Sequence, residues 1–260
     1  MGTTTESLGQ MPSFEVWNAH VGRAAGLIGS RGFPDALEAA LRLLAPFQMM
    51  NGFFYSPDSR AFDLYNEKIV ADRAIIVDRY VEGAFLLDPF YDAICSSNAR
   101  RMILMREIAP DDFAKTEYYR THYAATQIVD EIGFVMALAN GFTGVLSLSR
   151  TGNAPLFVEQ DLARFHSVAP LVCAIAERHW FHAPSLSLDS KSALPATRID
   201  HPLLTKREGQ IVTLILKGHS NHSIAATLSL SLNTVKVHRR QTYAKLNISS
   251  QVELFRLFFG

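Results

Sequence analysis

The spacing of apolar residues divides the first 180 residues into helical and extended segments. In the helical segments, apolar side chains recur every three or four positions, as they do along the buried face of a helix. Five segments share this pattern: residues 14–28, 35–44, 69–85, 88–97 and 159–180.

Other segments alternate between apolar and polar residues or are continuously apolar, which is typical of strands. Residues 48–56 and 60–65 predict a hairpin, because Pro57 occupies the favoured second position of a turn between them. Residues 132–139 predict a buried central strand. Residues 143–149, where Val and Leu alternate with Ser, predict a half-exposed one.

The order of the segments sets the fold class. Residues 102–108 predict one more strand, and residues 111–125 a short helix. Helices, a hairpin, helices, further strands and a terminal helix then follow one another. We therefore expect an α/β (α+β) N-terminal sandwich with a central antiparallel sheet flanked by helices.

We divide the chain into four parts. Residues 1–11 are polar and are expected to form a disordered N-terminus. The sandwich takes residues 12–181. Residues 182–201 are rich in Ser, Pro and Ala without periodicity, which predicts a linker. Residues 202–260 are expected to form an all-α domain.

The last sixty residues carry start and stop signals for four helices. These signals are the boxes Thr205–Glu208 and Ser250–Glu253, the capping residues Ser220 and Ser231, and Gly218 as a left-handed helix end. A short turn joins the second and third helices, which is the arrangement of a helix-turn-helix. The third helix, reaching about Leu246, would be the one that enters a DNA groove.

The third helix has two different faces at about 100° per residue. Val235, Thr242 and Leu246 share the face expected to pack inward. The opposite side and its flanks carry Asn233, Lys236, Val237, Arg240, Gln241 and Ala244. Arg and Lys donate to guanine edges and Val can touch a thymine methyl, so this side suits the major groove. The alternative is a solvated basic face on an ordinary helical hairpin.

Many positions at fixed spacing resemble the LuxR-type (FixJ/NarL-type) DNA-binding domain. The matching residues are Leu204-Thr205, Arg207-Glu208, Gly218, Ser220-Asn221, Ile224-Ala225, Leu228, Ser231, Thr234-Val235-Lys236, His238 and Lys245-Leu246. The resemblance implies that Lys236, Val237 and Arg240 read bases. It implies phosphate or positioning contacts by Thr234, His238 and Lys245. We also predict DNA contacts by Ser220, Asn221, Asn233 and Arg239, although Arg239 departs from the family pattern.

The formal net charge of zero is unevenly distributed. Residues 201–260 contain eight Lys/Arg and two Asp/Glu, a net charge of +6, and residues 1–200 carry −6. A basic C-terminal domain is what binding of double-stranded DNA by that end requires. The acidic remainder is not expected to bind DNA by itself.

The cysteines and the hydropathy of the chain indicate its cellular environment. Cys95 and Cys173 lie in apolar contexts without metal or redox spacing, and we expect both to be buried free thiols. No apolar run approaches the roughly 20 residues of a membrane span, and the polar first ten residues are no signal peptide. We expect a cytoplasmic protein that does not contact a membrane.

The N-terminal part, over about residues 35–180, is similar to the GAF/PAS-like sensing domains of LuxR-type regulators, which include acyl-homoserine-lactone binders. Leu87-Asp88-Pro89 and the strand Gly144–Ser149 carry the resemblance. It implies that Asp88 binds the amide of a signal molecule. The tryptophans of the lactone pocket are missing, since Trp17 and Trp180 are the only two in the chain.

Aromatic residues are frequent between positions 53 and 123 and could line an apolar pocket with a few polar anchors. The predicted ligand-binding residues are Asp88, Phe54, Tyr55, Tyr65, Tyr80 and Tyr91. The alternative is that the aromatic residues are ordinary core and that Asp88 is a helix N-cap.

The sequence contains none of the common catalytic or metal-binding motifs, and its histidines are scattered. We therefore predict no catalytic residues, no metal site and no cofactor. The expected function is a sequence-specific transcriptional regulator, controlled by a small apolar or amphipathic ligand, that binds a palindromic operator as a homodimer. RNA polymerase is a candidate partner.

Two alternatives remain for the N-terminal part: a ligand-free dimerisation or protein-interaction module, and, more remotely, an acyl-homoserine-lactone receptor. The apolar C-terminal helix is expected to dimerise. In the alternative, Leu254, Leu257 and Phe258 close the four-helix core and leave Phe255 and Phe259 against the N-terminal part.

Overall fold

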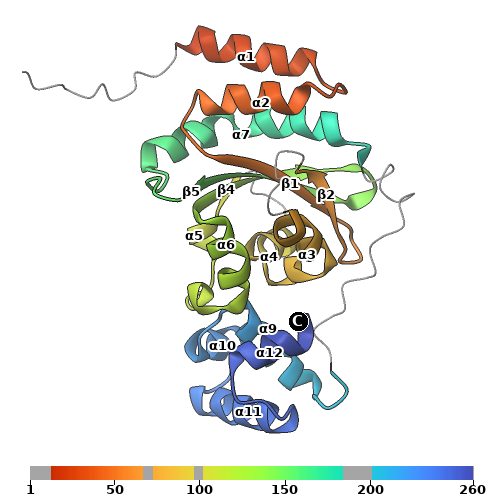
Figure 1. Cartoon of the computed structure of the whole chain (residues 1–260), viewed down its shortest axis with the longest axis vertical. Helices are drawn as coiled ribbons and strands as arrows, with labels where there is room; N and C mark the ends of the chain where they lie inside the picture. Colours follow the sequence, from red (N-terminus) through yellow and green to blue (C-terminus); the bar gives the residue numbers. More distant parts are fainter. Residues whose placement is uncertain (1–12, 67–72, 97–101, 184–200, 260) are drawn as a thin grey trace, which may run out of the picture.

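The computed structural model describes residues 13–66, 73–96, 102–183 and 201–259. The predicted disordered N-terminus and most of the predicted linker, residues 184–200, lie outside the described residues. In the described part, helices cover both faces of one antiparallel sheet, and a group of four helices lies at one end of the molecule (Figure 1). This confirms the predicted fold class.

The sheet has five strands in the order β2-β1-β5-β4-β3, and every described pair is antiparallel. The strands are β1 (Met49–Tyr55), β2 (Ala61–Tyr65), β3 (Met102–Leu104), β4 (Ile128–Ala137) and β5 (Thr143–Thr151). Because β5 lies between β1 and β4, the register aligns Glu131 of β4, Ser149 of β5 and Met49 of β1 in one row across the sheet.

Helices α2 (Phe33–Arg42) and α7 (Glu159–Trp180) cover one face, and α1 (Phe14–Gly26) packs on the outer side of α2 (Figure 1). The bounds of α7 are those predicted from its apolar stripe, and α1 and α2 match their predictions to within two residues. The apolar side chains of these helices form a buried core with the facing residues of the sheet, among them Phe33, Leu37, Phe54 and Phe165.

The other face is covered by short helices, and here three predictions are wrong. The described part of the predicted helix 69–85 consists of a π turn, η1 (Ala74–Asp78), and α3 (Arg79–Glu82). Gly83 ends α3, because its N–H donates to the carbonyls of that last turn. The chain continues as a 3-10 turn, η2 (Ala84–Leu87), and then as α4 (Pro89–Ser96).

The predicted strand 102–108 is a strand only over β3, because these three residues alone pair with β4; α5 (Met105–Ile108) follows. The predicted helix 111–125 is divided into η3 (Phe113–Lys115), η4 (Tyr119–Tyr123) and α6 (Ala124–Thr126). These breaks arise because the segment has to follow the edge of the sheet and also meet the C-terminal helices.

Two burial predictions are also corrected. The serines of β5, expected on a half-exposed face, are buried, with Ser149 fully inaccessible, because the short helices cover that face. Cys173 is a buried free thiol as predicted, whereas Cys95 is exposed near the end of α4.

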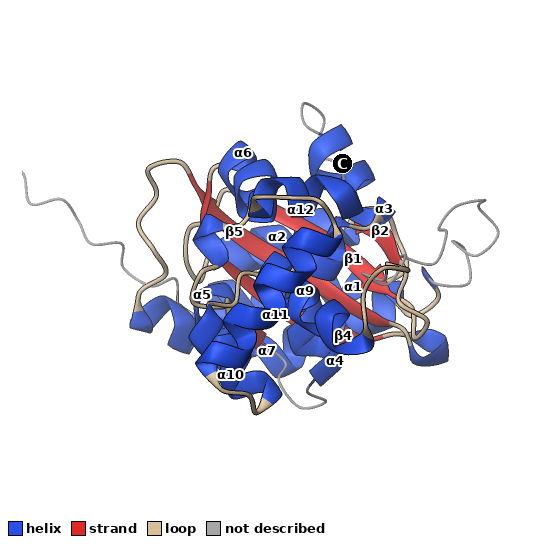
Figure 2. Cartoon of the chain, turned by 90° about the horizontal axis from the view of Figure 1, so that it is seen from below, coloured by secondary structure: helices blue, strands red, loops and turns tan. Residues whose placement is uncertain are grey.

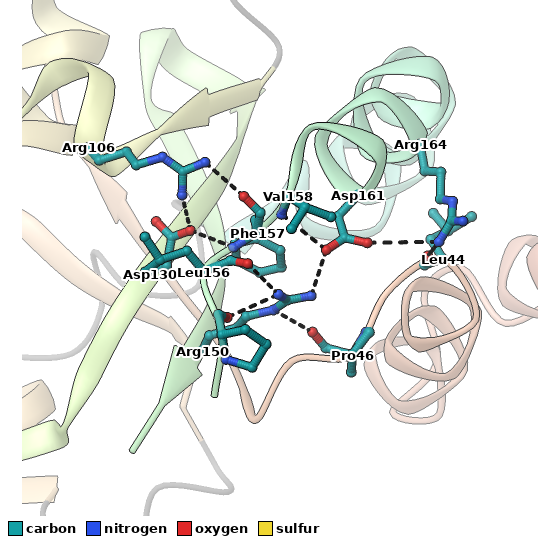
Figure 3. Close-up of polar contacts among 11 residues, drawn as sticks. Leu44, Pro46, Arg106, Asp130, Arg150, Leu156, Phe157, Val158, Asp161 and Arg164 are labelled. Carbon is teal, nitrogen blue, oxygen red and sulfur yellow. Dashed lines mark hydrogen bonds and ion pairs between the residues drawn. The ribbon is translucent and has the colours of Figure 1, made fainter. Parts of the chain in front are cut away.

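A network of charged residues joins the end of β5 to the start of α7 (Figure 3). The buried guanidinium of Arg150 donates to Asp161 at 2.9 Å and to the carbonyls of Pro46, Pro155 and Leu156 at 2.8–3.0 Å. Beside it, Arg106 pairs with Asp130, which also accepts from the backbone N–H of Phe157 at 2.8 Å. The network thus holds the chain that leads into α7.

The C-terminal helices are α9 (Lys206–Lys217), α10 (Asn221–Leu228), α11 (Leu232–Lys245) and α12 (Gln251–Phe259). Their caps are those predicted: a Thr205–Glu208 box, Ser220, Ser231, and Gly218 in the left-handed conformation with φ +94°. Seen from their side, these helices lie in front of the sheet (Figure 2).

The four helices pack against the short helices of the N-terminal part and share one apolar core with them. Gly218 lies so close to Phe113 that a Cβ on Gly218 would approach Phe113 Cα to 2.7 Å, and the Gly218 carbonyl accepts from the N–H of Asp112 at 2.8 Å. Among the described residues, no helix is long and apolar enough to cross a membrane.

Helix α12 packs against the N-terminal part through Phe255, Phe258 and Phe259. The alternative interpretation of the sequence placed Phe255 and Phe259 there. Leu254 is fully buried in the four-helix core, whereas Leu257 is 46% exposed and does not close that core. Much of the apolar surface of α12 is therefore used within the chain.

Candidate nucleic-acid interface and sensor cavity

Helix α11 presents one polar face to solvent. Its inner residues Val235 and Thr242 are fully buried, and Ser231 caps its start by accepting from the N–H of Thr234 at 3.0 Å. The residues predicted on the outer side are all exposed: Asn233, Lys236, Val237, Arg240, Gln241 and Ala244. The structure therefore brings Lys236, Val237 and Arg240 together on one accessible surface.

Three further predicted DNA contacts lie at the junction of α10 and α11. Arg239 donates to the side-chain oxygen of Asn221 at 3.4 Å and to the Tyr243 hydroxyl at 3.3 Å. Its guanidinium also lies 5.4 Å from the centre of the Tyr243 ring. His238 is half-buried, and its Nδ1 makes no hydrogen bond with the described residues. Arg239 and Asn221 thus form one polar group.

Lys245, at the end of α11, donates to the buried carboxylate of Glu208 at 2.7 Å. This hydrogen bond, with those from Thr205, lowers the pKa of Glu208 to about 2. The Lys245 side chain is still 41% exposed. Its ammonium therefore anchors α11 to α9, while part of the Lys245 side chain is exposed to solvent.

The predicted contact residue Ser220 faces the N-terminal part. Hydrogen bonds from the Ser220 side chain and from its backbone N–H, the latter at 2.9 Å, lower the pKa of the Asp111 carboxyl. Lys217, just before this turn, pairs with Asp92 of α4. Two carboxylates of the N-terminal part thus hold the turn between α9 and α10.

A buried cavity of about 20 Å³ lies between the sheet and the short helices. Among the predicted ligand residues, Tyr55, Tyr80 and Asp88 line it. The Tyr55 hydroxyl lies 2.6 Å from the Tyr80 hydroxyl, which donates to Asp88 at 2.6 Å. The sequence therefore identified one connected chain of polar groups in this cavity.

Asp88 also accepts from the N–H of Phe90 at 2.8 Å, in the first turn of α4. Asp88 therefore caps the first turn of α4, as the alternative predicted, and it also lines the cavity; its binding of a ligand stays a prediction. Burial is the main cause that raises the pKa of Asp88 to about 6.

Three other predicted ligand residues do not line this cavity. Phe54 and Tyr65 belong to the core on the opposite face of the sheet, with α1, α2 and α7. Side chains alternate along a strand, so Phe54 points away from the face that carries its neighbours Phe53 and Tyr55. Tyr91 packs against Tyr55, with ring centres 5.2 Å apart, outside the lining.

Sequence reasoning missed several polar residues of the cavity, among them Glu131 on β4 and Asn51 on β1. Glu131 accepts from the Tyr123 hydroxyl at 2.7 Å and from the Ser149 hydroxyl at 3.4 Å. Burial, as the largest cause, raises its pKa to about 7. The available signal was a polar residue inside an apolar strand, because such a residue must find a partner in the core.

Known proteins are similar to both the C-terminal helices and the N-terminal part of this chain. Residues 202–258 match the family described as bacterial regulatory proteins, luxR family. An HTH-type transcriptional regulator in the exeN 3′ region of Aeromonas salmonicida is 32% identical over 155 residues, which are 55% of this chain and 79% of that protein. The monoamine regulon transcriptional regulator of Klebsiella aerogenes is 35% identical over 176 residues, 68% of this chain and 69% of that protein.

The N-terminal part resembles two solved structures. The VqsR LBD domain of Pseudomonas aeruginosa is 25% identical with a TM-score of 0.55, covering 64% of this chain and 98% of that one. The N-acylhomoserine lactone dependent LuxR family transcription factor CepR2 of Burkholderia cenocepacia shares the fold, at 15% identity and a TM-score of 0.50, over 66% of this chain and 97% of that one. With its exposed basic helix α11, the chain belongs to the luxR family of bacterial regulatory proteins, which are DNA-binding transcription regulators and not enzymes.

Proposed function

We propose that the chain binds a specific palindromic operator as a homodimer and that a small molecule in the N-terminal part controls this binding. The observation that carries the proposal is the outer face of α11, where Lys236, Val237 and Arg240 are exposed while Val235 and Thr242 anchor the helix. Arg and Lys can donate to guanine, and Val can contact a thymine methyl. RNA polymerase is the partner through which such a protein would act on transcription.

Arg240→Ala is expected to weaken binding to the preferred DNA by about 1–3 kcal/mol and to relax base preference at one position. The preferred duplex would be selected from a random pool with the wild-type chain, and affinities measured at one fixed salt concentration. Arg256→Ala, an exposed arginine on α12, is the matched control. Equal loss on the selected and on a random duplex would limit Arg240 to phosphate contacts.

Lys245→Gln is expected to weaken binding to all duplexes alike, with the salt dependence of log K reduced by about one. The reason is the partly exposed, positively charged side chain of Lys245 at the end of α11. Unfolding must be measured alongside, because Glu208 loses its partner in this variant. An unchanged salt slope would assign Lys245 to the contact between α9 and α11 alone.

A second candidate function for the N-terminal part is a ligand-free dimerisation module. A cavity of about 20 Å³ favours it, since this space holds roughly one water molecule. Phe14 and Val16 on α1 are 76% and 44% exposed and offer apolar surface to a second copy. Sedimentation of the wild-type chain and a Phe14→Ser variant tests this surface, and mass spectrometry of the denatured protein tests for a retained ligand.

A further inference from the structure

Two carboxylates and one side-chain amide meet in the buried cavity beneath β1, β4 and β5. Asp88, Glu131 and Asn51 all line it, and each residue is at least 94% buried. The side-chain oxygen of Asn51 has no hydrogen-bond partner among the described residues. A buried acceptor without a donor is uncommon in folded proteins and calls for an explanation.

Among the residues that the structure describes, the lining of this cavity includes no lysine and no arginine. The groups that donate to the two carboxylates are neutral: the hydroxyls of Tyr80, Tyr123 and Ser149, and the N–H of Phe90. His122 also lines the cavity, but burial lowers its pKa to about 4, so its ring is uncharged at neutral pH. Buried carboxylates are normally paired with a positive charge, and none of the lining residues supplies one.

The rings around these acceptors suit a cation. Phe53 and Tyr80 pack with ring centres 4.2 Å apart, and both line the cavity together with Tyr55. The faces of aromatic rings attract ammonium groups, and more strongly where water is excluded.

The available volume decides how large the charged group can be. A space of about 20 Å³ has room for a group the size of a water molecule, such as one ammonium head. A second cavity of about 220 Å³ lies between the N-terminal part and α12, lined on one side by Gly83 and Tyr118 and on the other by Phe255, Phe258 and Phe259. His122 lines both cavities, so the two spaces are neighbours at this residue.

We propose that the N-terminal part binds a small primary amine, with its ammonium among Asp88, Glu131 and Asn51 and its apolar body against the phenylalanines of α12. This inference rests on the proposed control of DNA binding by a small molecule. Since α12 belongs to the DNA-binding helices, a ligand in this position would contact both parts of the chain.

The test uses the full chain and pairs of probes that differ only in charge: 2-phenylethylamine against 2-phenylethanol, and pentylamine against 1-pentanol. Calorimetry at neutral pH should show binding of an amine and none of its alcohol. Asn51→Leu should weaken amine binding by about tenfold, the size of one hydrogen bond to a charged group. This variant removes an acceptor that has no partner, so it is expected to fold.

Glu131→Gln should weaken amine binding at least as much as Asn51→Leu, whereas the matched control Glu159→Gln, at an exposed position of α7, should leave it unchanged. Equal binding of amine and alcohol, or no binding of either amine at millimolar concentration, would overturn the inference. DNA binding by the same preparation separates the two ideas. If the chain binds selected DNA but no amine, the proposed DNA-binding function stands and only the amine ligand is excluded.

Discussion

Arg150→Ala is expected to lower the free energy of unfolding by about 3–5 kcal/mol. The guanidinium of Arg150 is 97% buried by its neighbours, since its side chain is only 3% exposed. Removing it leaves Asp161 without its closest cation and leaves the carbonyls of Pro46, Pro155 and Leu156 without a donor. Uncompensated buried charge is among the few causes of losses this large.

Urea unfolding of the variant and the wild type would measure this loss. Arg178→Ala, an exposed arginine on α7, serves as the matched control and should change stability by less than about 0.5 kcal/mol. Asp161→Ala should resemble Arg150→Ala, because it leaves the guanidinium unpaired. A loss below about 1 kcal/mol for Arg150→Ala would mean that water enters and replaces the network.

The second large effect concerns pH. The pKa of Glu131 is raised from 4.5 to about 7 in the folded chain, chiefly by burial. A carboxyl whose pKa is raised by folding contributes stability that is present below its unfolded pKa and lost as pH rises through its folded pKa. Between about pH 5 and pH 9, Glu131 should therefore reduce stability by an amount on the order of 3 kcal/mol.

Asp88, with a pKa raised from 3.8 to about 6, acts in the same direction at lower pH. Glu131→Gln should remove most of the stability loss above pH 6, whereas Glu159→Gln should keep it. Urea unfolding of the three proteins at pH 5.5, 7 and 8.5 makes the comparison. If the free energy of unfolding changed with pH in the same way for wild type and Glu131→Gln, Glu131 would ionise as easily in the folded state as in the unfolded state.

The parts predicted well from sequence are those that local chemistry determines. Thr205, Ser220 and Ser231 cap helices through their own side chains, and Gly218 ends one through its backbone conformation. The outer face of α11 followed from helical geometry once its inner residue Val235 was identified. These features depend on residues within a few positions of one another.

The cavity was predicted only in part, because it depends on contacts between distant strands. Alternation in β1 shows that Phe54 and Tyr55 point in opposite directions, but both faces of β1 are buried and carry aromatic residues. Nothing within β1 says which of the two faces meets Asp88. The position of Glu131 opposite Ser149 likewise depends on the register of β4 and β5, which is fixed by the whole sheet.

The contact between Asp111 and Ser220 joins residues 109 positions apart and has no signature in the sequence. A backbone N–H carries one proton, and in this structure the proton of Ser220 is directed at Asp111. Any other anion that approaches this end of α10 competes with a carboxylate that is already tethered there. In the intact chain, the hydrogen bond from Ser220 to Asp111 must therefore break before a DNA phosphate can accept from the Ser220 N–H.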